Sequence, residues 1–491
     1  MRHKRHLLAA VSLATVLSAC GDSTTGPGGD PNPSPKLVAT VSLTPATDTI
    51  VLGETFLLAV RLEDAQGGLM TGVPINWSSS NGSVASVDSN GFVTGTGAGI
   101  ATITATAQGK SGTANVTGLI VDLATVEGGF LFTCGLTTGG AAYCWGFNGS
   151  GVIGNGSNAA SAAPSPVVGG LTFATLAVGD KHACGITTDG AVFCWGSNGS
   201  GALGNGSTNG PETCDIGGSV GCSTAPVPVA GNHTFAALSA GNDYTCGLEP
   251  SGNIYCWGWN LFGQLGDGTN SSNATPVAVS GGITFASISA GNTHTCAVST
   301  NGDAYCWGDN EVGQLGGVVG ESSSVPVLVS GGHSFASVGA GVLHSCGVAT
   351  SASAYCWGFN RVGELGDGTD VQSTTPVAVS GGLSFLTISS GWDFSCGVTL
   401  SGAAYCWGLG DSNQLGRGET ESSAAPLAVV GGLTFSSVDA GTGQHACGMT
   451  ADGTAYCWGN GIDGQLGIGG PTFLLSRLSE NPVRVLGQPP G

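Results

Sequence analysis

Alternating apolar and polar positions run along most of the chain and predict short β-strands separated by turns. Between residues 37 and 118, stretches such as TFLLAVRLED, GFVTGTGAG and IATITATAQG alternate in this way and are bounded by turn-forming residues. Because this segment contains no cysteine, its stability must come from a hydrophobic core. The pattern predicts a small β-sandwich over residues 37–118.

From residue 119 onward the alternation becomes periodic. A phrase with two cysteines, most legible as CGVTLSGAAYCWG at residues 396–408, occurs seven times, and its first cysteines follow one another at intervals of 50, 62, 50, 50, 50 and 51 residues. A typical repeat has one strand pattern at residues 285–289, two around the cysteine turn and a fourth near residues 325–329. Four strands in each of seven units predict a seven-bladed β-propeller over residues 119–491.

The two cysteines of each repeat are separated by nine residues. In a hairpin with a three-residue loop, two such residues lie directly opposite one another, within reach of a disulfide. Zinc sites usually bring cysteines two to four residues apart, so the spacing favours disulfides over a metal. The predicted repeat pairs are Cys134 and Cys144, Cys184 and Cys194, Cys246 and Cys256, Cys296 and Cys306, Cys346 and Cys356, Cys396 and Cys406, and Cys447 and Cys457.

The hairpin loop requires a left-handed residue six positions after the first cysteine, as in a turn closed by a glycine bulge. Six of the repeats have glycine at this position. The fifth has Ala352, so we predict a different or mildly strained turn there, at roughly 1 kcal/mol. The six glycines are Gly140, Gly190, Gly252, Gly302, Gly402 and Gly453.

Both segments resemble known families. The repeats share the AG before the hairpin, the WG after it and runs similar to NxxGQLGxG, as at residues 260–268, 360–368 and 413–418, and so resemble the regulator of chromosome condensation repeats. That resemblance implies a propeller. Residues 77–106 look like the bacterial immunoglobulin-like group 2 domain, which implies a stalk or adhesion module, with Trp77 in the core and Gly91 and Gly99 in turns. The expected fold is therefore all-β, an immunoglobulin-like sandwich followed by a seven-bladed propeller.

The first residues predict export. MRHKRH is basic, and residues 7–19 form an apolar run too short to span a bilayer, as in a signal peptide over residues 1–19. The run ends in LSAC, which resembles the bacterial lipobox and implies lipidation of Cys20; a plain secretory signal with a chance cysteine is the alternative. Residues 20–36 form a flexible tether rich in Pro, Gly and Ser. Gly rather than Asp follows Cys20, which favours the outer membrane by the sorting pattern of some bacteria.

Cysteine and charge content agree with an exported protein. Of the 17 cysteines, Cys20 and the seven repeat pairs leave only Cys214 and Cys222, which we predict to form an eighth bridge. Without the signal the chain has eight basic and 31 acidic residues, a net charge of −23. Nucleic-acid binding requires Lys and Arg against phosphates, so this balance argues against nucleic acid as a partner. We expect no cofactor, and a monomer that meets the membrane through its lipid anchor only.

Two sets of ring side chains recur in the repeats. Two residues before each first cysteine stands Phe, Tyr or His, and because Phe fills this position too, we interpret the set as stacking and hydrogen-bonding within each blade rather than a metal ring. The Trp after each second cysteine is interpreted as packing between blades rather than a ligand platform. The first set is Phe132, His182, Tyr244, His294, His344, Phe394 and His445. The second is Trp145, Trp195, Trp257, Trp307, Trp357, Trp407 and Trp458.

One stretch breaks the repeat pattern. Between the second and third repeats, the segment from Asn205 to Thr224 contains the extra residues of the 62-residue interval and the pair of Cys214 and Cys222. A pinned surface loop at a blade end is a candidate recognition element. The alternative is a tolerated insertion stabilised by its own bridge.

Enzymatic motifs are scarce in the sequence. It contains no HExxH or complete GxxxxGK[ST] pattern. GDGT at residues 266–269 and 366–369 offers one carboxylate each, so we interpret both as ordinary turns rather than calcium loops. A glycosidase or lyase would need two acids that converge in the funnel, and the candidate acids are scattered. They include Asp243, Asp303, Asp393, Glu311 and Glu364.

We therefore predict a non-enzymatic, surface-anchored binding or scaffold protein, whose sandwich presents the propeller to a protein or a glycan. One alternative is an enzyme inhibitor, since a secreted bacterial β-lactamase inhibitor uses a similar propeller; another is a polysaccharide lyase or hydrolase. Eukaryotic members of the repeat family exchange guanine nucleotides on a small GTPase, but the basic surface of that role is missing here. We also expect residues 119–126 and 482–487 to meet and seal the ring.

Overall fold

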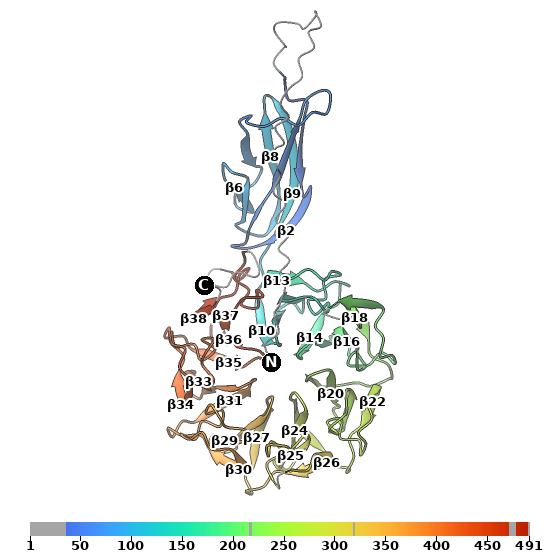
Figure 1. Ribbon diagram of the computed structural model, residues 1–491, viewed down its shortest axis with the longest axis vertical. Coiled ribbons are helices and arrows are strands. Elements are labelled where there is room, and N and C mark those ends of the chain that lie inside the picture. Colours follow the sequence, from blue (N-terminus) through green and yellow to red (C-terminus); the bar gives the residue numbers. More distant parts are fainter. Residues whose placement is uncertain (1–35, 216–218, 318–319, 471–477, 490–491) are drawn as a thin grey trace, which may run out of the picture.

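The computed structural model describes residues 36–215, 219–317, 320–470 and 478–489, and every regular element in these ranges is a β-strand. Figure 1 shows a sandwich that projects from the edge of a ring of sheets, in the plane of the ring, so that it leaves both faces of the ring uncovered. The predicted all-β class is confirmed. Within the described ranges, no helix is long and apolar enough to cross a membrane. Cys20 and the predicted signal peptide lie outside them.

Nine strands form the sandwich, in sheets with the orders β1-β4, β2-β9-β8-β5 and β3-β7-β6. Alternate residues of these strands point into one core, where Ile50, Val93 and Ile103 have no exposed surface. As predicted, Trp77 packs against this core, with its ring over the turn residue Gly91, where an added Cβ would lie 2.7 Å from the ring. The strands are β1 (Thr40–Thr44), β2 (Thr47–Val51), β3 (Thr55–Leu57), β4 (Ala59–Glu63), β5 (Asn76–Ser79), β6 (Ala85–Val87), β7 (Phe92–Gly95), β8 (Gly99–Ala107) and β9 (Lys110–Leu119).

Seven sheets form the ring, and each is built from strands that are consecutive in the chain, the first innermost. The first three blades are β10 (Leu123–Gly128), β11 (Phe132–Thr137), β12 (Ala142–Gly146), β13 (Ser161–Pro166); β14 (Phe173–Val178), β15 (His182–Thr187), β16 (Val192–Ser197), β17 (Glu212–Asp215), β18 (Ser219–Pro228); and β19 (Ala237–Ala240), β20 (Tyr244–Leu248), β21 (Ile254–Gly258), β22 (Asn273–Ala278). The second blade thus has five strands, because β17 pairs with the outer side of β18.

The other four blades repeat the same four-stranded plan. They are β23 (Phe285–Ala290), β24 (His294–Ser299), β25 (Ala304–Gly308), β26 (Ser323–Leu328); β27 (Phe335–Ala340), β28 (His344–Ala349), β29 (Ala354–Gly358), β30 (Ser373–Ala378); β31 (Phe385–Ser390), β32 (Phe394–Thr399), β33 (Ala404–Gly408), β34 (Ser423–Ala428); and β35 (Phe435–Asp439), β36 (His445–Thr450), β37 (Ala455–Asn460), β38 (Leu478–Arg484).

A disulfide joins the second and third strands of every blade. The two cysteines of each repeat lie directly opposite one another in the ladder, with Cα atoms 4.0 to 4.1 Å apart. The pairs are those expected from the nine-residue spacing, because a three-residue turn sets this register. The seven repeat bridges join Cys134 to Cys144, Cys184 to Cys194, Cys246 to Cys256, Cys296 to Cys306, Cys346 to Cys356, Cys396 to Cys406 and Cys447 to Cys457.

Two features depart from the common repeat. An eighth bridge joins Cys214 and Cys222 across β17 and β18, in the inserted segment of the second blade. In the fifth blade, Ala352 keeps the hairpin turn of the other repeats and adopts a φ of 66°. Because this left-handed conformation is unfavourable for a residue with a Cβ, the predicted strain is confirmed at this position.

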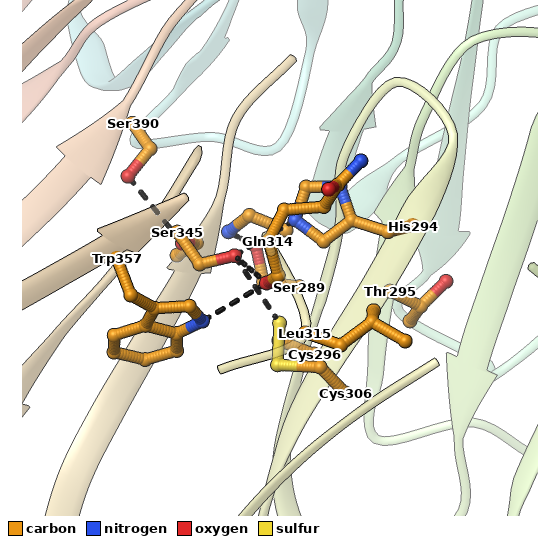
Figure 2. The surroundings of a disulfide bond; sticks show 12 residues. Ser289, His294, Thr295, Cys296, Cys306, Gln314, Leu315, Ser345, Trp357 and Ser390 are labelled. Carbon is orange, nitrogen blue, oxygen red and sulfur yellow. Dashed lines mark hydrogen bonds between the residues drawn. A yellow bond between two sulfur atoms is a disulfide. The ribbon is translucent and has the colours of Figure 1, made fainter. Parts of the chain in front are cut away.

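A relay of hydrogen bonds joins each blade to the next, and Figure 2 shows one example. The hydroxyl of Ser345 and the indole nitrogen of Trp357 both donate to the carbonyl oxygen of Gln314 in the preceding blade, each at 2.9 Å. His294 lies 2.8 Å from the same hydroxyl. Because that hydroxyl donates its hydrogen to Gln314, His294 must donate from Nε2. His182, His294, His344 and His445 each bond to a hydroxyl of the next blade, which corrects the prediction of hydrogen bonding within each blade. The Trp residues pack between blades, as predicted.

The outermost strands are protected against pairing with other chains. In six blades the outermost strand contains a proline, which lacks an N–H and cannot complete a ladder with an added strand. In the second blade, β17 pairs with the first part of β18, and Pro226 lies beyond this pairing. The seven prolines are Pro164, Pro226, Pro276, Pro326, Pro376, Pro426 and Pro482.

The ends of the propeller meet where the sandwich joins it. The N–H of Val121 donates to the carbonyl of Gly487 at 2.6 Å, and the N–H of Gly487 donates to the carbonyl of Leu52 in the sandwich at 2.9 Å. The expected meeting of the terminal segments is confirmed. No strand is shared, however: β10 is the innermost strand of the first sheet and β38 is the outermost strand of the seventh. Packing of Val51 into the same core makes the sandwich part of the ring seam.

Candidate functional site

Two faces of the ring differ in what they present. The strands of a blade alternate in direction, so the first and third strands end on the same side. We call this side the loop face; it carries the connections from the first to the second strand and from the third to the fourth. The opposite side, the turn face, carries the cysteine hairpin turns and the connections between blades.

In the first five blades a buried asparagine accepts an N–H of the long loop after the third strand, whereas the sixth and seventh blades have Gly410 and Gly461 at this position. In the third blade Asn260 is fully buried; its side-chain oxygen accepts the N–H of Leu265 at 2.9 Å and its amide donates to the carbonyl of Thr269 at 3.0 Å. The first, second and fifth blades repeat this arrangement. The residue directly after Trp-Gly differs between blades: Phe147, Ser197, Trp259, Asp309, Phe359, Leu409 and Asn460.

Aromatic side chains gather on the loop face at these variable positions. Trp259 meets Phe262 edge to face, with ring centroids 5.6 Å apart. The guanidinium of Arg361 lies 5.7 Å from the centroid of the Phe359 ring, and both residues reach solvent. Aromatic and Arg side chains are enriched at protein interfaces and among the few residues that supply most of the binding energy. The loop face therefore has the composition of a recognition surface.

The Cys214–Cys222 hairpin stands at the rim of the same face. It leads into the loop-face end of β18, where Cys222 pairs with Ser197. Val220 covers Gly199, at which an added Cβ would lie 2.8 Å from the valine side chain. Glu212 accepts a hydrogen bond from the Thr224 hydroxyl at 2.9 Å. The predicted candidate loop, Asn205 to Thr224, is thus a braced hairpin beside the aromatic loops.

On the loop face, side chains that follow the innermost strands of four blades make two contacts between blades. The rings of Phe130 and Trp392, from the first and sixth blades, lie 5.0 Å apart between centroids. Asp180 of the second blade accepts a hydrogen bond from the Asn292 amide of the fourth blade at 3.3 Å. Burial raises the pKa of Asp180 to about 6. Each contact joins two blades that are not neighbours in the ring.

Two carboxylates that the sequence analysis did not select face the channel. Glu127 and Asp439 each pair with the first cysteine of their blade, a position that holds Ala, Ser or Gly in the other five blades. Asp439 accepts the N–H of Gly128 at 2.6 Å and the hydroxyl of Ser389 at 3.0 Å. Burial and the neighbouring charge of Asp439 raise the pKa of Glu127 to about 8, and burial raises that of Asp439. An alignment of the seven repeats on their cysteines would have shown both acids as departures from the small residues of the other blades.

The acids selected from the sequence do not converge on one site. Asp243 pairs with Lys181 at 3.4 Å on the loop face, whereas Asp303 is exposed in a hairpin turn. Glu364 lies buried beneath the loop face, where burial, together with the charge of Asp393, raises its pKa to about 7. Asp267 and Asp367 each accept hydrogen bonds from the Thr two residues on, as in ordinary Asx turns.

The buried histidines are held as neutral rings. Burial lowers the pKa of His182, His344 and His445 to about 4 and that of His294 to about 3. Each meets a Ser or Thr hydroxyl of the next blade, so none of the four faces another in a ligand cluster. Across the described ranges there is no group of three or more His, Cys, Asp or Glu side chains that could hold a metal ion.

Comparisons with known proteins agree with this architecture. The profile of the RCC1-like domain family matches residues 173–486, and that of the bacterial Ig-like domain (group 2) matches residues 37–118. Yeast RCC1 (Prp20), solved bound to Kap60, is similar with a TM-score of 0.61 and 20% identity over 75% of this chain and 85% of that one. Human WBSCR16 is similar with a TM-score of 0.59 and 20% identity over 67% of this chain and 87% of that one. At these identities the solved structures show the fold alone. No curated protein matches the sequence.

Proposed function

The chain belongs to the RCC1-like domain family, and from this premise we propose that it is a surface-anchored binding protein whose loop face recognises a macromolecular partner. The combination of an RCC1-like propeller with an Ig-like domain supports a binding or scaffold role. Eight disulfides and a bacterial Ig-like domain place it outside the cytoplasm. The sandwich holds the ring by its edge and leaves both faces accessible (Figure 1).

One observation supports the loop face over the turn face. The asparagine that holds the long loop repeats in the first five blades, whereas the residue after each Trp-Gly varies and is aromatic in three blades. These rings are partly exposed and, at Phe359, combined with an arginine. This pattern suits a protein partner, with the Cys214–Cys222 hairpin at the rim as a second contact. Kap60 is bound by yeast RCC1; for this chain the partner is identified only by the chemistry of the face.

The partner is tested by crosslinking and pull-down on whole cells. The intact protein is compared with a Trp259→Ala/Phe359→Ala variant and with a variant lacking residues 208–223. Leu400→Ala removes an exposed apolar side chain from a hairpin turn on the opposite face and is the matched control. We expect one set of captured proteins that the control retains and the loop-face variant loses. Equal capture by all variants would refute the loop face, and capture of glycan alone would make the ligand a polysaccharide.

Anchoring is tested separately. We propose that Cys20 is lipidated and tethers the sandwich and ring to the envelope through residues 20–36, most simply at the outer membrane. Replacing Cys20 by Ser should release the protein from the membrane fraction. An unchanged membrane fraction would refute lipidation while leaving the loop-face proposal untouched.

An enzymatic function is favoured by one feature only, the carboxylate pair in the channel. Asp439 is occupied in holding Gly128 and Ser389, which gives the pair a structural task. A polysaccharide lyase or hydrolase would turn over members of a glycan panel and lose that activity in Glu127→Gln. We expect no turnover by the purified protein.

A further inference from the structure

The charged residues of the propeller are unevenly divided between its two faces. With the β17–β18 hairpin left out, the described residues of the loop-face connections include 14 Asp and Glu and three Lys and Arg. The hairpin turns and the connections between blades, on the turn face, include four Asp and Glu and no Lys or Arg. Solubility alone would not require such a bias, so the excess of negative charge on the loop face bears on what this face binds.

Most of these acids lie in three neighbouring blades. The loop-face connections of the fourth, fifth and sixth blades, which we call the acidic sector, contain ten Asp and Glu and two Arg. Figure 1 shows these blades on the side of the ring away from the sandwich. Glu311, Asp370 and Asp411 are exposed, and none of the ten acids forms an ion pair with another described residue. The acidic sector therefore presents unpaired negative charge to solvent.

The first and second blades present an apolar pocket on the same face. Its volume is about 180 Å³, and Phe130, Leu131 and Phe147 line it and are partly exposed. Lys181 also lines it, but its ammonium group is paired with Asp243 at 3.4 Å. Because a liquid water occupies about 30 Å³, the pocket has room for one large apolar side chain. Apolar anchors that enter such pockets are typical of protein interfaces.

An aromatic contact joins the pocket to the acidic sector. The ring centroid of Phe130, in the pocket lining, lies 5.0 Å from that of Trp392 in the sixth blade. The residue after Trp392 is Asp393, and burial and the neighbouring charge of Asp411 raise the pKa of its carboxyl. A side chain held in the pocket therefore lies close to the edge of the acidic sector, so a single partner can engage both features.

We propose, in an inference that rests on the proposed function of the loop face, that the partner is a protein segment with one large apolar side chain and several Lys or Arg residues. The apolar side chain enters the pocket, and the cations lie over the acidic sector. Opposite charges on the two surfaces speed association and exclude acidic partners. A metal ion does not fit these acids, because the described residues include no group of three or more His, Cys, Asp or Glu that could hold one.

The test titrates the full chain, by calorimetry, with a synthetic peptide that has one Phe, a flexible Gly-Ser spacer and four Lys. Matched peptides have Ala in place of Phe or Glu in place of Lys. We expect the Phe-Lys peptide to bind at least 10-fold more tightly than either, and high salt to weaken it because salt screens exposed charges. Equal affinity for the Lys and Glu peptides would overturn the proposal. A chitosan oligomer carries amino groups without an apolar anchor, and tighter binding of chitosan would overturn the assignment to a protein partner.

Two charge variants separate the loop face from the net charge of the protein. Glu311→Gln/Asp411→Asn removes two exposed carboxylates from the acidic sector, and Asp189→Asn/Asp303→Asn removes two exposed carboxylates from hairpin turns of the opposite face. The first should weaken the Phe-Lys peptide at least fivefold, and the second should leave its affinity unchanged. Equal losses would show attraction to overall charge and would overturn the proposal. The comparison of Lys and Glu peptides on the unaltered protein decides the matter even if a variant misfolds.

A pocket variant tests the apolar anchor. Phe147→Ala should weaken the Phe-Lys peptide and leave the peptide with Ala in place of Phe unchanged, and equal effects on both peptides would overturn the role of the pocket. The whole-cell experiment separates this inference from the proposed function. If Trp259→Ala/Phe359→Ala loses the captured partner and Glu311→Gln/Asp411→Asn retains it, the loop face recognises a partner that is not basic, and this inference alone fails. If capture is equal in all variants, the proposed function fails.

Discussion

The interface between blades predicts an unusual pH dependence at His344. This ring is fully buried, and its Nε2 lies 2.8 Å from the hydroxyl of Ser395 in the next blade. Burial lowers its pKa from 6.5 to about 4. Because the folded pKa is below the unfolded one, the unfolded chain binds the proton first, so stability is complete above pH 6.5 and falls as the pH drops toward 4.

The perturbation is His344→Phe, since Phe394 and Phe132 fill the same position in other blades. At pH 7.5 the variant loses one hydrogen bond, about 1 kcal/mol, while Ser395 keeps its bond to the Glu364 carbonyl. At pH 5 the histidine costs the unaltered protein about 2 kcal/mol, from 1.36 kcal/mol per pKa unit over the interval from 6.5 to 5. The variant should therefore be the less stable protein at pH 7.5 and the more stable one at pH 5.

The assay is urea unfolding with the disulfides intact, at both pH values. Phe394→Leu is the control, because it alters the same position of the next blade without an ionisable group. Its loss of stability should not change with pH. If the difference between His344→Phe and the unaltered protein were the same at both pH values, the account of the neutral buried imidazole would be wrong.

Three further changes have defined outcomes. Ala352→Gly removes the side chain from a left-handed position and should raise the free energy of unfolding by about 1 kcal/mol in chemical denaturation; a loss would contradict the strain inferred there. Ser289 accepts a hydrogen bond from the N–H of Ala340 in the next blade, and Gly339 occupies the equivalent position one blade later. A Cβ on Gly339 would lie 3.6 Å from the Ser390 nitrogen, so Gly339→Ser should add the equivalent bond from the N–H of Ser390. We expect a gain of about 1 kcal/mol, measured as a rise of a few degrees in melting temperature. Glu364→Gln replaces a buried carboxyl whose pKa is raised from 4.5 to about 7. Because the folded pKa is above the unfolded one, the protonated carboxyl favours the fold below pH 4.5, and this stability is lost as the pH rises through 7. The variant should therefore be more stable than the unaltered protein by up to about 3 kcal/mol at pH 8 and by almost nothing at pH 4.5, and a pH-independent gain would refute the shift.

Local patterns in the sequence determined most of the fold. The nine-residue spacing and the Gly turn predict the opposed cysteines, because both act within one hairpin. Contacts between blades were harder to foresee. The bond from His294 to Ser345 joins residues 51 apart in sequence, and nothing in either strand alone shows that they meet. The shared seam of Leu52, Val121 and Gly487 likewise depends on how two domains pack.

The candidate site was only partly predictable for a related reason. The Cys214–Cys222 hairpin was found because it interrupts the period. Glu127 and Asp439 were missed because each is an ordinary residue in its own strand and becomes conspicuous only when the repeats are aligned on their cysteines. The channel brings these two acids together, although they are more than 300 residues apart in the chain.

Site-specific photocrosslinking on whole cells tests the central claim most directly. A photoreactive residue replaces Phe359 on the loop face in one protein and Leu400 on the turn face in another, and both retain Cys20 and all sixteen other cysteines. The account predicts that the probe at position 359 captures one partner protein and that the probe at position 400 captures none. Capture of the same partner from position 400 alone would contradict recognition through the loop face.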